Sequence, residues 1–182
     1  MRPMQHLKLW LSEHANDRHY LFTLHDLRAL CPTLSDPAFK TLLSRAVRSE
    51  LLLRLCRGIY LYKKSAILDG LLLFHTAALL RAKAFNYISL ETVLSDAGVI
   101  SQIPMNWVSI MSSGRSRIMS CGDFGTIEFI HTNQKPTDLI NQLTYDHHCG
   151  LWRANVALAL RDMKITHRNC DLINWDIAHE LI

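Results

Sequence analysis

The strongest structural constraint in this sequence is an amphipathic pattern between residues 36 and 49. Apolar side chains recur there three and four positions apart, which is the spacing of one face of an α-helix. Ser35 can cap this helix, and Asp36 and Pro37 suit its first turn. The sequence therefore predicts a helix from about Asp36 to Ser49 that buries one stripe of side chains. That stripe consists of Phe39, Leu42, Leu43, Ala46 and Val47.

Two more helices are predicted before this one. Residues 3–15 place apolar side chains at helical spacing, and a polar break follows them. Residues 24–30 form a second, short helix, because Thr23 and Asp26 ahead of it make a variant of the capping box. Pro32 then marks a turn that leads into the amphipathic helix.

The segment from residue 51 to residue 64 predicts a β-hairpin. Two β-prone runs flank Arg57 and Gly58, and the glycine supplies the positive φ that a tight turn needs. In an alternating strand, the aliphatic side chains can point inward while the others point outward or gather near the ends. The inward set is Leu53, Leu55, Ile59 and Leu61, and the outward set is Arg54, Tyr60, Tyr62, Lys63 and Lys64.

The net charge of +4 conceals an uneven distribution. Residues 1–64 carry 11 Lys and Arg against 5 Asp and Glu, whereas residues 65–182 carry 9 against 11. A basic first part beside a slightly acidic second part indicates that the first part faces a polyanion such as nucleic acid. A basic face that is only solvated is the alternative, and charge alone leaves both readings open.

The order helix, helix, turn, basic helix and basic hairpin is typical of a winged helix-turn-helix, which we predict for residues 1–64. An α-helix fits the DNA major groove, where its polar side chains can reach base edges. The start of that helix could receive a phosphate, and the hairpin would neutralise others along the backbone. The candidate DNA-binding residues are Ser35, Lys40, Thr41, Ser44, Arg45 and Arg48 of the helix, and Arg54, Arg57, Tyr60, Lys63 and Lys64 of the hairpin.

The second part of the chain, residues 65–182, mixes helical and strand patterns, so we predict an α+β domain there and the α+β class for the whole chain. Helices are expected at about residues 65–84, 90–97, 137–143 and 153–163, and in the tail around residue 175. Strands are expected at about residues 87–88, 107–111, 115–120 and 125–132.

Three stretches resemble one known family, the AbiEi-type antitoxins of bacterial type IV toxin–antitoxin systems. Residues 22–62 look like the family's N-terminal winged helix, which ends in an Arg-Gly-hydrophobic-Tyr wing tip, here Arg57 to Tyr60. Residues 87–100, with the sequence YISLETVLSDAGVI, are similar to the segment that follows in the family. Residues 153–163, with the sequence RANVALALRDM, are similar to a later helix of the family.

This resemblance implies a DNA-binding autorepressor that binds repeats in its own operator. It also implies an antitoxin that opposes a nucleotidyltransferase-type toxin without needing to bind it tightly. The implied partners are therefore double-stranded operator DNA and such a toxin. Residues 1–64 would repress, and residues 65–182 would be required for antitoxicity. The alternative from another functional class is a non-enzymatic interaction module that uses the winged helix as a protein-docking scaffold.

A metal site is not expected from the histidines and cysteines. Structural zinc ligands usually come in pairs two to four residues apart. The adjacent residues His147, His148 and Cys149 would point to opposite faces of a strand, so at most two of them could converge. His167 and Cys170 give one pair at suitable spacing. Surface or loop histidines are the better interpretation, and no cofactor is predicted.

An enzyme is not expected either. Asp123 and Glu128 lie close together as in a restriction-type nuclease, but Ile130 stands where such a nuclease needs a basic residue. The phosphate-binding motifs GxxxxGK[ST] and GxGxxG are absent. Cys149 beside His148 does not indicate a hydrolase, because catalytic partners meet in space rather than in sequence.

The cellular location follows from three weaker observations. No apolar run reaches the roughly 18 residues that a membrane-spanning helix needs. The N-terminal residues lack the features of a secretion signal. The five cysteines are an odd number and widely spread, which does not suggest disulfides. We therefore expect a cytoplasmic protein.

Overall fold

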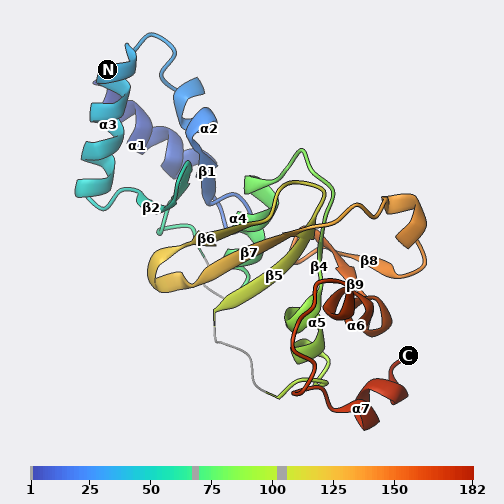
Figure 1. Ribbon diagram of the computed structural model, residues 1–182. Helices are drawn as coiled ribbons and strands as arrows, with labels where there is room; N and C mark the ends of the chain where they lie inside the picture. The colour runs from blue at the N-terminus through green and yellow to red at the C-terminus, as the bar shows by residue number, and fades with distance from the viewer. Residues whose placement is uncertain (1, 67–69, 102–105) are drawn as a thin grey trace. The chain divides into compact units, whose positions relative to one another are not determined.

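Helices and strands occur in both halves of the chain, which confirms the α+β class (Figure 1). The computed structural model describes residues 2–66, 70–101 and 106–182. The chain divides into two compact units, Met1–Asp69 and Gly70–Ile182. The boundary predicted from charge and pattern lay earlier, between residues 64 and 65.

The first unit, within residues 2–66, combines helices with a small antiparallel sheet. The helices are α1 (Pro3–His14), α2 (Leu24–Ala29) and α3 (Asp36–Arg48), close to their predicted ranges. The strands are β1 (Leu21–Thr23), β2 (Leu53–Cys56) and β3 (Ile59–Leu61), in the order β1-β3-β2. β1 was not predicted, because three residues are too few to show an alternating pattern.

The N-termini of α2 and α3 are capped as predicted. The Thr23 hydroxyl accepts the N–H of Asp26 at 3.1 Å, and the Asp26 carboxylate accepts the N–H of Thr23 at 2.8 Å. These two bonds complete a capping box at the start of α2. The Ser35 hydroxyl accepts the N–H of Ala38 at 3.4 Å and so caps α3.

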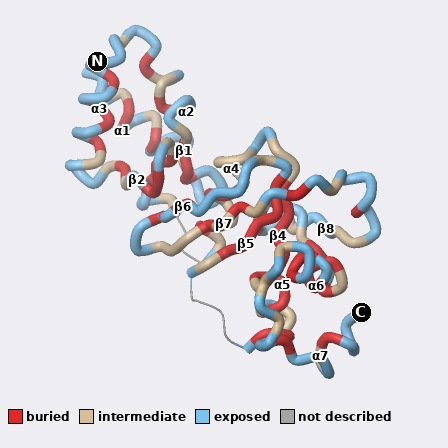
Figure 2. Tube along the Cα trace, viewed as in Figure 1, coloured by how far each residue is buried: buried red, intermediate tan, exposed pale blue. Residues whose placement is uncertain are grey.

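The core of the first unit lies where the three helices meet the sheet (Figure 2). The stripe predicted on α3 is part of this core, with Val47 partly buried at its edge. Burying such a stripe is what stabilises a short helix in water. The buried members are Leu7, Leu11, Phe22, Leu27, Cys31, Phe39, Leu42, Leu43, Ala46, Leu52, Tyr60 and Tyr62.

The predicted outward orientation of the hairpin tyrosines is wrong. Tyr60 and Tyr62 are only 8% and 4% exposed, and both belong to the core. β3 is the central strand between β1 and β2, and every residue of it is buried. The sequence suggested a two-stranded ribbon with one exposed face, because it did not reveal that β1 pairs with β3.

The second unit contains a mixed sheet whose strands, within the described residues, follow the order β6-β7-β5-β4-β9-β8. β5 pairs with β7 in parallel, as does β4 with β9, and the other neighbours are antiparallel. The strands are β4 (Asn86–Ile88), β5 (Trp107–Ser112), β6 (Arg117–Ser120), β7 (Thr126–His131), β8 (Leu143–Asp146) and β9 (Leu151–Ala154).

Four α-helices and two short 3-10 turns accompany this sheet in the described part of the second unit. Among all described residues, none of the helices has both the length and the apolar character needed to cross a bilayer. The helices are α4 (Leu72–Leu80), α5 (Leu90–Asp96), α6 (Val156–Ile165) and α7 (Trp175–Glu180), and the 3-10 turns are η1 (Gly122–Phe124) and η2 (Pro136–Leu139).

Three predicted helices of the second unit need correction. The helix expected over residues 65–84 is confined to α4, and residues 67–69 of that prediction lie outside the described part. The helix expected over residues 137–143 is wrong, since η2 is followed there by a turn over residues 140–142 and by the first residue of β8. The helix expected from residue 153 begins later, because β9 precedes it. β9 pairs with β4 as well as with β8, and the pairing with β4 joins residues far apart in sequence, which local patterns do not reveal.

A buried carboxyl group lies between α6 and the sheet. Asp162 of α6 is fully buried and accepts hydrogen bonds from Ser89 Oγ at 2.7 Å and Gln134 Nε2 at 3.1 Å. Burial raises the pKa of Asp162 above its ordinary value, although these two donors act in the opposite direction. The carboxyl thus links α6 to the loops that follow β4 and β7.

This burial predicts a pH-dependent stability. Because the folded pKa of Asp162 is raised, its contribution is fully present below its unfolded pKa of about 4 and is lost as pH rises through the folded pKa. Relative to the Asp162→Asn variant, the wild-type free energy of unfolding should therefore fall as pH rises. Urea titrations monitored by circular dichroism over a pH series would measure the difference.

The matched control is Asp123→Asn, because the Asp123 side chain is exposed. The difference in free energy of unfolding between Asp123→Asn and the wild type should not fall as pH rises. If the two variants gave the same pH profile, burial of Asp162 would not be the cause.

Candidate nucleic-acid interface

Helix α3 presents a polar face opposite its buried stripe. With 3.6 residues per turn, Thr41, Ser44 and Arg48 lie opposite the core, Lys40 on one flank and Arg45 on the other. All five side chains are exposed, as the sequence predicted. The Thr41 hydroxyl donates to the carbonyl of Pro37 at 2.9 Å, so it is left mainly as an acceptor. The other four have the reach and chemistry to contact base edges or phosphates.

The turn between α2 and α3 is held by the guanidinium of Arg28. It donates to the carbonyl of Cys31 at 2.5 Å and to that of Leu34 at 2.7 Å. It also lies 3.5 Å from the Asp36 carboxylate and 5.2 Å from the centre of the Phe39 ring. A planar fork with several donors can satisfy these partners at once. Arg28 therefore fixes the direction in which α3 leaves the turn.

The cations of α3 have no ion-pair partner within residues 2–66. Within residues 2–66, the Arg28–Asp36 contact is the one ion pair in the structure. Lys40, Arg45 and Arg48 are exposed and carry charge that no acidic side chain within residues 2–66 pairs with. Such a surface attracts a polyanion, and this attraction is sensitive to salt.

The start of α3 is less suited to a phosphate than the sequence indicated. Ser35 is exposed, but Asp36 in the first turn places a carboxylate beside the helix N-terminus. The Asp36 side chain is 82% exposed, so its charge is only loosely paired with Arg28. A second anion there would meet repulsion from this carboxylate.

The hairpin contributes four further exposed cations. Arg54 lies on β2, Arg57 lies at the tip beside Gly58, and Lys63 and Lys64 follow β3. Gly58 has a φ of +85°, which explains why glycine stands at the tip. Tyr60, predicted above as a binding residue, is buried in the core and leaves a ligand almost no side-chain surface to contact.

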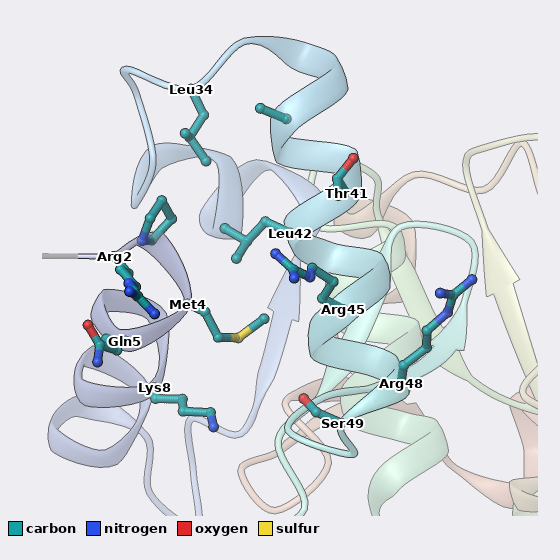
Figure 3. Close-up of a pocket in the computed structure, with 12 residues that line it drawn as sticks. Arg2, Met4, Gln5, Lys8, Leu34, Thr41, Leu42, Arg45, Arg48 and Ser49 are labelled. Carbon is teal, nitrogen blue, oxygen red and sulfur yellow. The ribbon is translucent and has the colours of Figure 1, made fainter.

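A groove of about 950 Å³ lies between α1 and α3 (Figure 3). We call it the basic groove. Its apolar lining includes Met4, Leu34 and Leu42, its cations include Arg2, Lys8 and Arg45, and no Asp or Glu lines it.

Figure 3 shows how the cations lie around the basic groove. Arg45 reaches from α3 toward α1, whereas Arg48 points away from α1. Arg2 and Lys8 were missed by sequence reasoning, because only the packing of α1 beside α3 brings them near Arg45. Their presence on the first predicted helix was visible, but its orientation was not.

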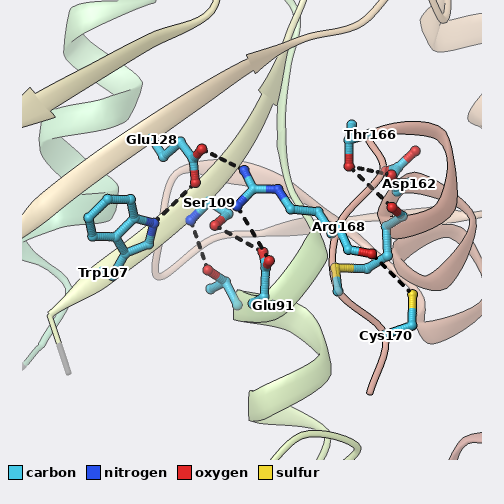
Figure 4. A network of polar contacts seen from close by, with 10 residues as sticks. Glu91, Trp107, Ser109, Glu128, Asp162, Thr166, Arg168 and Cys170 are labelled. Atoms are coloured by element: carbon cyan, nitrogen blue, oxygen red, sulfur yellow. Dashed lines mark hydrogen bonds and ion pairs between the residues drawn. The ribbon is translucent and has the colours of Figure 1, made fainter. Parts of the chain in front are cut away.

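Glu128, one of the two carboxylates considered for a nuclease, is paired inside the second unit (Figure 4), whereas the other, Asp123, is exposed. Arg168 lies 2.5 Å from Glu128 and 3.4 Å from Glu91. Trp107 Nε1 donates to Glu128 at 3.2 Å. Glu128 is thus held by an arginine and an indole, an arrangement that neutralises it rather than leaving it to bind a metal.

The thiol of Cys149 is also unsuited to catalysis. Burial raises its pKa to about 12, and the neighbouring Asp146 acts in the same direction. A thiol with such a pKa contains almost no nucleophilic thiolate at neutral pH. Among the described residues, no group of three or more His, Cys, Asp or Glu side chains is arranged to hold a metal ion.

Removing the Arg28 guanidinium should loosen the turn before α3. Arg28→Ala should lower the free energy of unfolding by about 1–3 kcal/mol, since two partly buried carbonyls lose a charged donor. Arg28→Lys should lower it by a similar amount, because one ammonium group cannot reproduce the fork. Urea unfolding measures both, with Arg18→Ala as an exposed control expected within about 0.5 kcal/mol of wild type. An equal loss in Arg28→Ala and Arg18→Ala would show that the turn does not depend on this side chain.

Comparison of the sequence with protein-family models and with curated proteins gives no match. The resemblance to AbiEi-type antitoxins therefore rests on the three stretches of sequence quoted above. The function proposed below is argued from the exposed charges of the first unit, and this resemblance is added to that argument.

Proposed function

We propose that the chain is a DNA-binding transcriptional repressor whose first unit is a winged helix-turn-helix. One observation carries the proposal: the exposed face of α3 bears cations that no acidic side chain within residues 2–66 neutralises. The hairpin adds exposed cations of the same sign. Double-stranded DNA is the polyanion that such a helix and hairpin can engage together.

In this proposal α3 lies in the major groove. Ser44 and Arg48 face the base edges, and Lys40 and Arg45 reach them or the flanking phosphates from either side of the helix. The wing, β2 and β3, follows the backbone through Arg54, Arg57, Lys63 and Lys64. Tyr60 takes no part, because it is buried.

We further propose that the repressor is the antitoxin of a type IV pair and opposes a nucleotidyltransferase-type toxin. The support for this role is the resemblance of residues 22–62, 87–100 and 153–163 to the AbiEi family. The second unit would carry the antitoxin activity, in a cytoplasmic protein without enzymatic activity or cofactor.

Two substitutions should separate base contacts from phosphate contacts. Arg48→Ala should weaken binding to the preferred duplex by about 1–3 kcal/mol and reduce discrimination against other sequences. Lys63→Ala should weaken binding to all duplexes alike and lower the slope of log affinity against log salt by about one. Fluorescence anisotropy with DNA from upstream of the gene, and with a scrambled duplex, measures both effects.

The matched control is Arg18→Ala, which removes an exposed arginine outside α3 and the hairpin. Its affinity and salt slope should equal those of the wild type. Absence of binding to either duplex at low salt would overturn the proposal and favour the protein-docking alternative. Equal effects of Arg48→Ala and Lys63→Ala on both duplexes would overturn only the assignment of roles.

A further inference from the structure

An exposed acidic segment ends the described chain. Residues 171–182, which we call the acidic segment, contain three acidic residues and no Lys or Arg. Four large apolar side chains of this segment are also exposed: Leu172 57%, Trp175 40%, Leu181 49% and Ile182 69%. Apolar side chains gathered on a short acidic stretch are typical of a surface that binds a partner.

The acidic segment is held in a defined shape on the second unit. The N–H of Asn174 donates to the carbonyl of Val99 at 2.9 Å, and Ile173 forms an isolated antiparallel β-bridge with Ile100. Ala178 of α7 is fully buried. Lys164 lies 5.6 Å from the centre of the Trp175 ring. The exposed apolar side chains are thus presented by an ordered element, which lowers the entropy cost of binding.

The basic groove of the first unit has the complementary composition. Met4, Leu34 and Leu42 give it an apolar lining, and its charged side chains are all cations. α1 and α3 line its two sides, which suits an elongated occupant such as a short helix with apolar anchors. The groove is cationic and apolar, and the acidic segment is anionic and apolar.

We propose that the basic groove binds the acidic segment of a second copy of this chain. Trp175 and Leu172 would enter the apolar part, and Asp176 and Glu180 would face Lys8 and Arg45. When each of two copies lends its segment to the groove of the other, both grooves are filled and the assembly closes at two chains. Closed two-fold assemblies of this kind are the commonest homo-oligomers.

This inference does not rest on the proposed function, although Thr41, Arg45 and Arg48 both line the groove and are candidate DNA contacts. A docked segment would cover Arg45 and so compete with DNA for α3. The test is therefore made without DNA, so that failure of the docking and failure of DNA binding are distinguished.

The test exchanges the charges of the two surfaces in the full chain. One variant carries Lys8→Glu and Arg45→Glu, which makes the groove acidic. The other carries Asp176→Lys and Glu180→Lys, which makes the segment basic. Each variant alone pairs like charges and should self-associate at least about tenfold more weakly than the wild type. Mixed together, they restore opposite charges at both contacts and should form a heterodimer, measured by sedimentation velocity over a range of concentrations.

Two controls accompany this exchange. Lys83→Glu with Lys135→Glu changes the net charge by the same amount as the groove variant, at exposed positions outside the groove, and should dimerise like the wild type. Trp175→Ala should weaken the dimer, whereas Trp152→Ala should not, although Trp152 is comparably exposed at 43%. Circular dichroism checks that each variant is folded.

Three results would overturn the inference. The first is a wild type that stays monomeric throughout, which includes the case in which the segment docks within its own chain. The second is a dimer that neither charge-reversed variant weakens. The third is a mixture of the two variants that does not associate.

Discussion

The geometry of the first unit depends on one side chain of α2, Arg28, which reaches into the turn before α3. Arg28 bonds two backbone carbonyls after α2, approaches Asp36 at the start of α3, and stacks on Phe39 one turn later. A turn with free carbonyls would be costly to bury, and the guanidinium satisfies them. Because α3 starts from this turn, the direction in which its polar face points follows from the same contacts.

The two faces of α3 then serve opposite physical roles. The buried face supplies apolar area that stabilises the unit, and the exposed face concentrates positive charge. Arg45 and Arg48 lie less than one helical turn apart and have no ion-pair partner within residues 2–66, so repulsion between their charges costs stability. A polyanion that binds the face removes this cost, and so the charge pattern is better suited to binding than to folding.

In the second unit, several charged side chains are paired with one another. Arg168 lies between Glu91 and Glu128, and Arg153 lies 2.6 Å from Asp96 and 3.2 Å from Asp146. Asp162 is fully buried against hydrogen-bond donors. These groups connect helices to the sheet and are neutralised inside the unit. The contrast with α3 explains why the candidate interface lies in the first unit, while the exposed side chains of the acidic segment form the surface of interest in the second.

The sequence by itself determined the elements whose signals are local. The stripe on α3, the capping box at Thr23, the cap at Ser35 and the glycine at the hairpin tip are all set by neighbours in the chain. The exposed cations of α3 follow from the same helical spacing, so most of the candidate site could be predicted.

Only the tertiary structure decided the features that depend on distant pairing. β1 makes β3 a central strand and buries Tyr60, and pairing of β4 with β9 places a strand where the start of a helix was predicted. Packing of α1 beside α3 brings Lys8 near Arg45. The physical reason is that strand pairing and helix packing are stabilised by contacts between residues far apart in sequence, which leave no periodic trace in either segment alone.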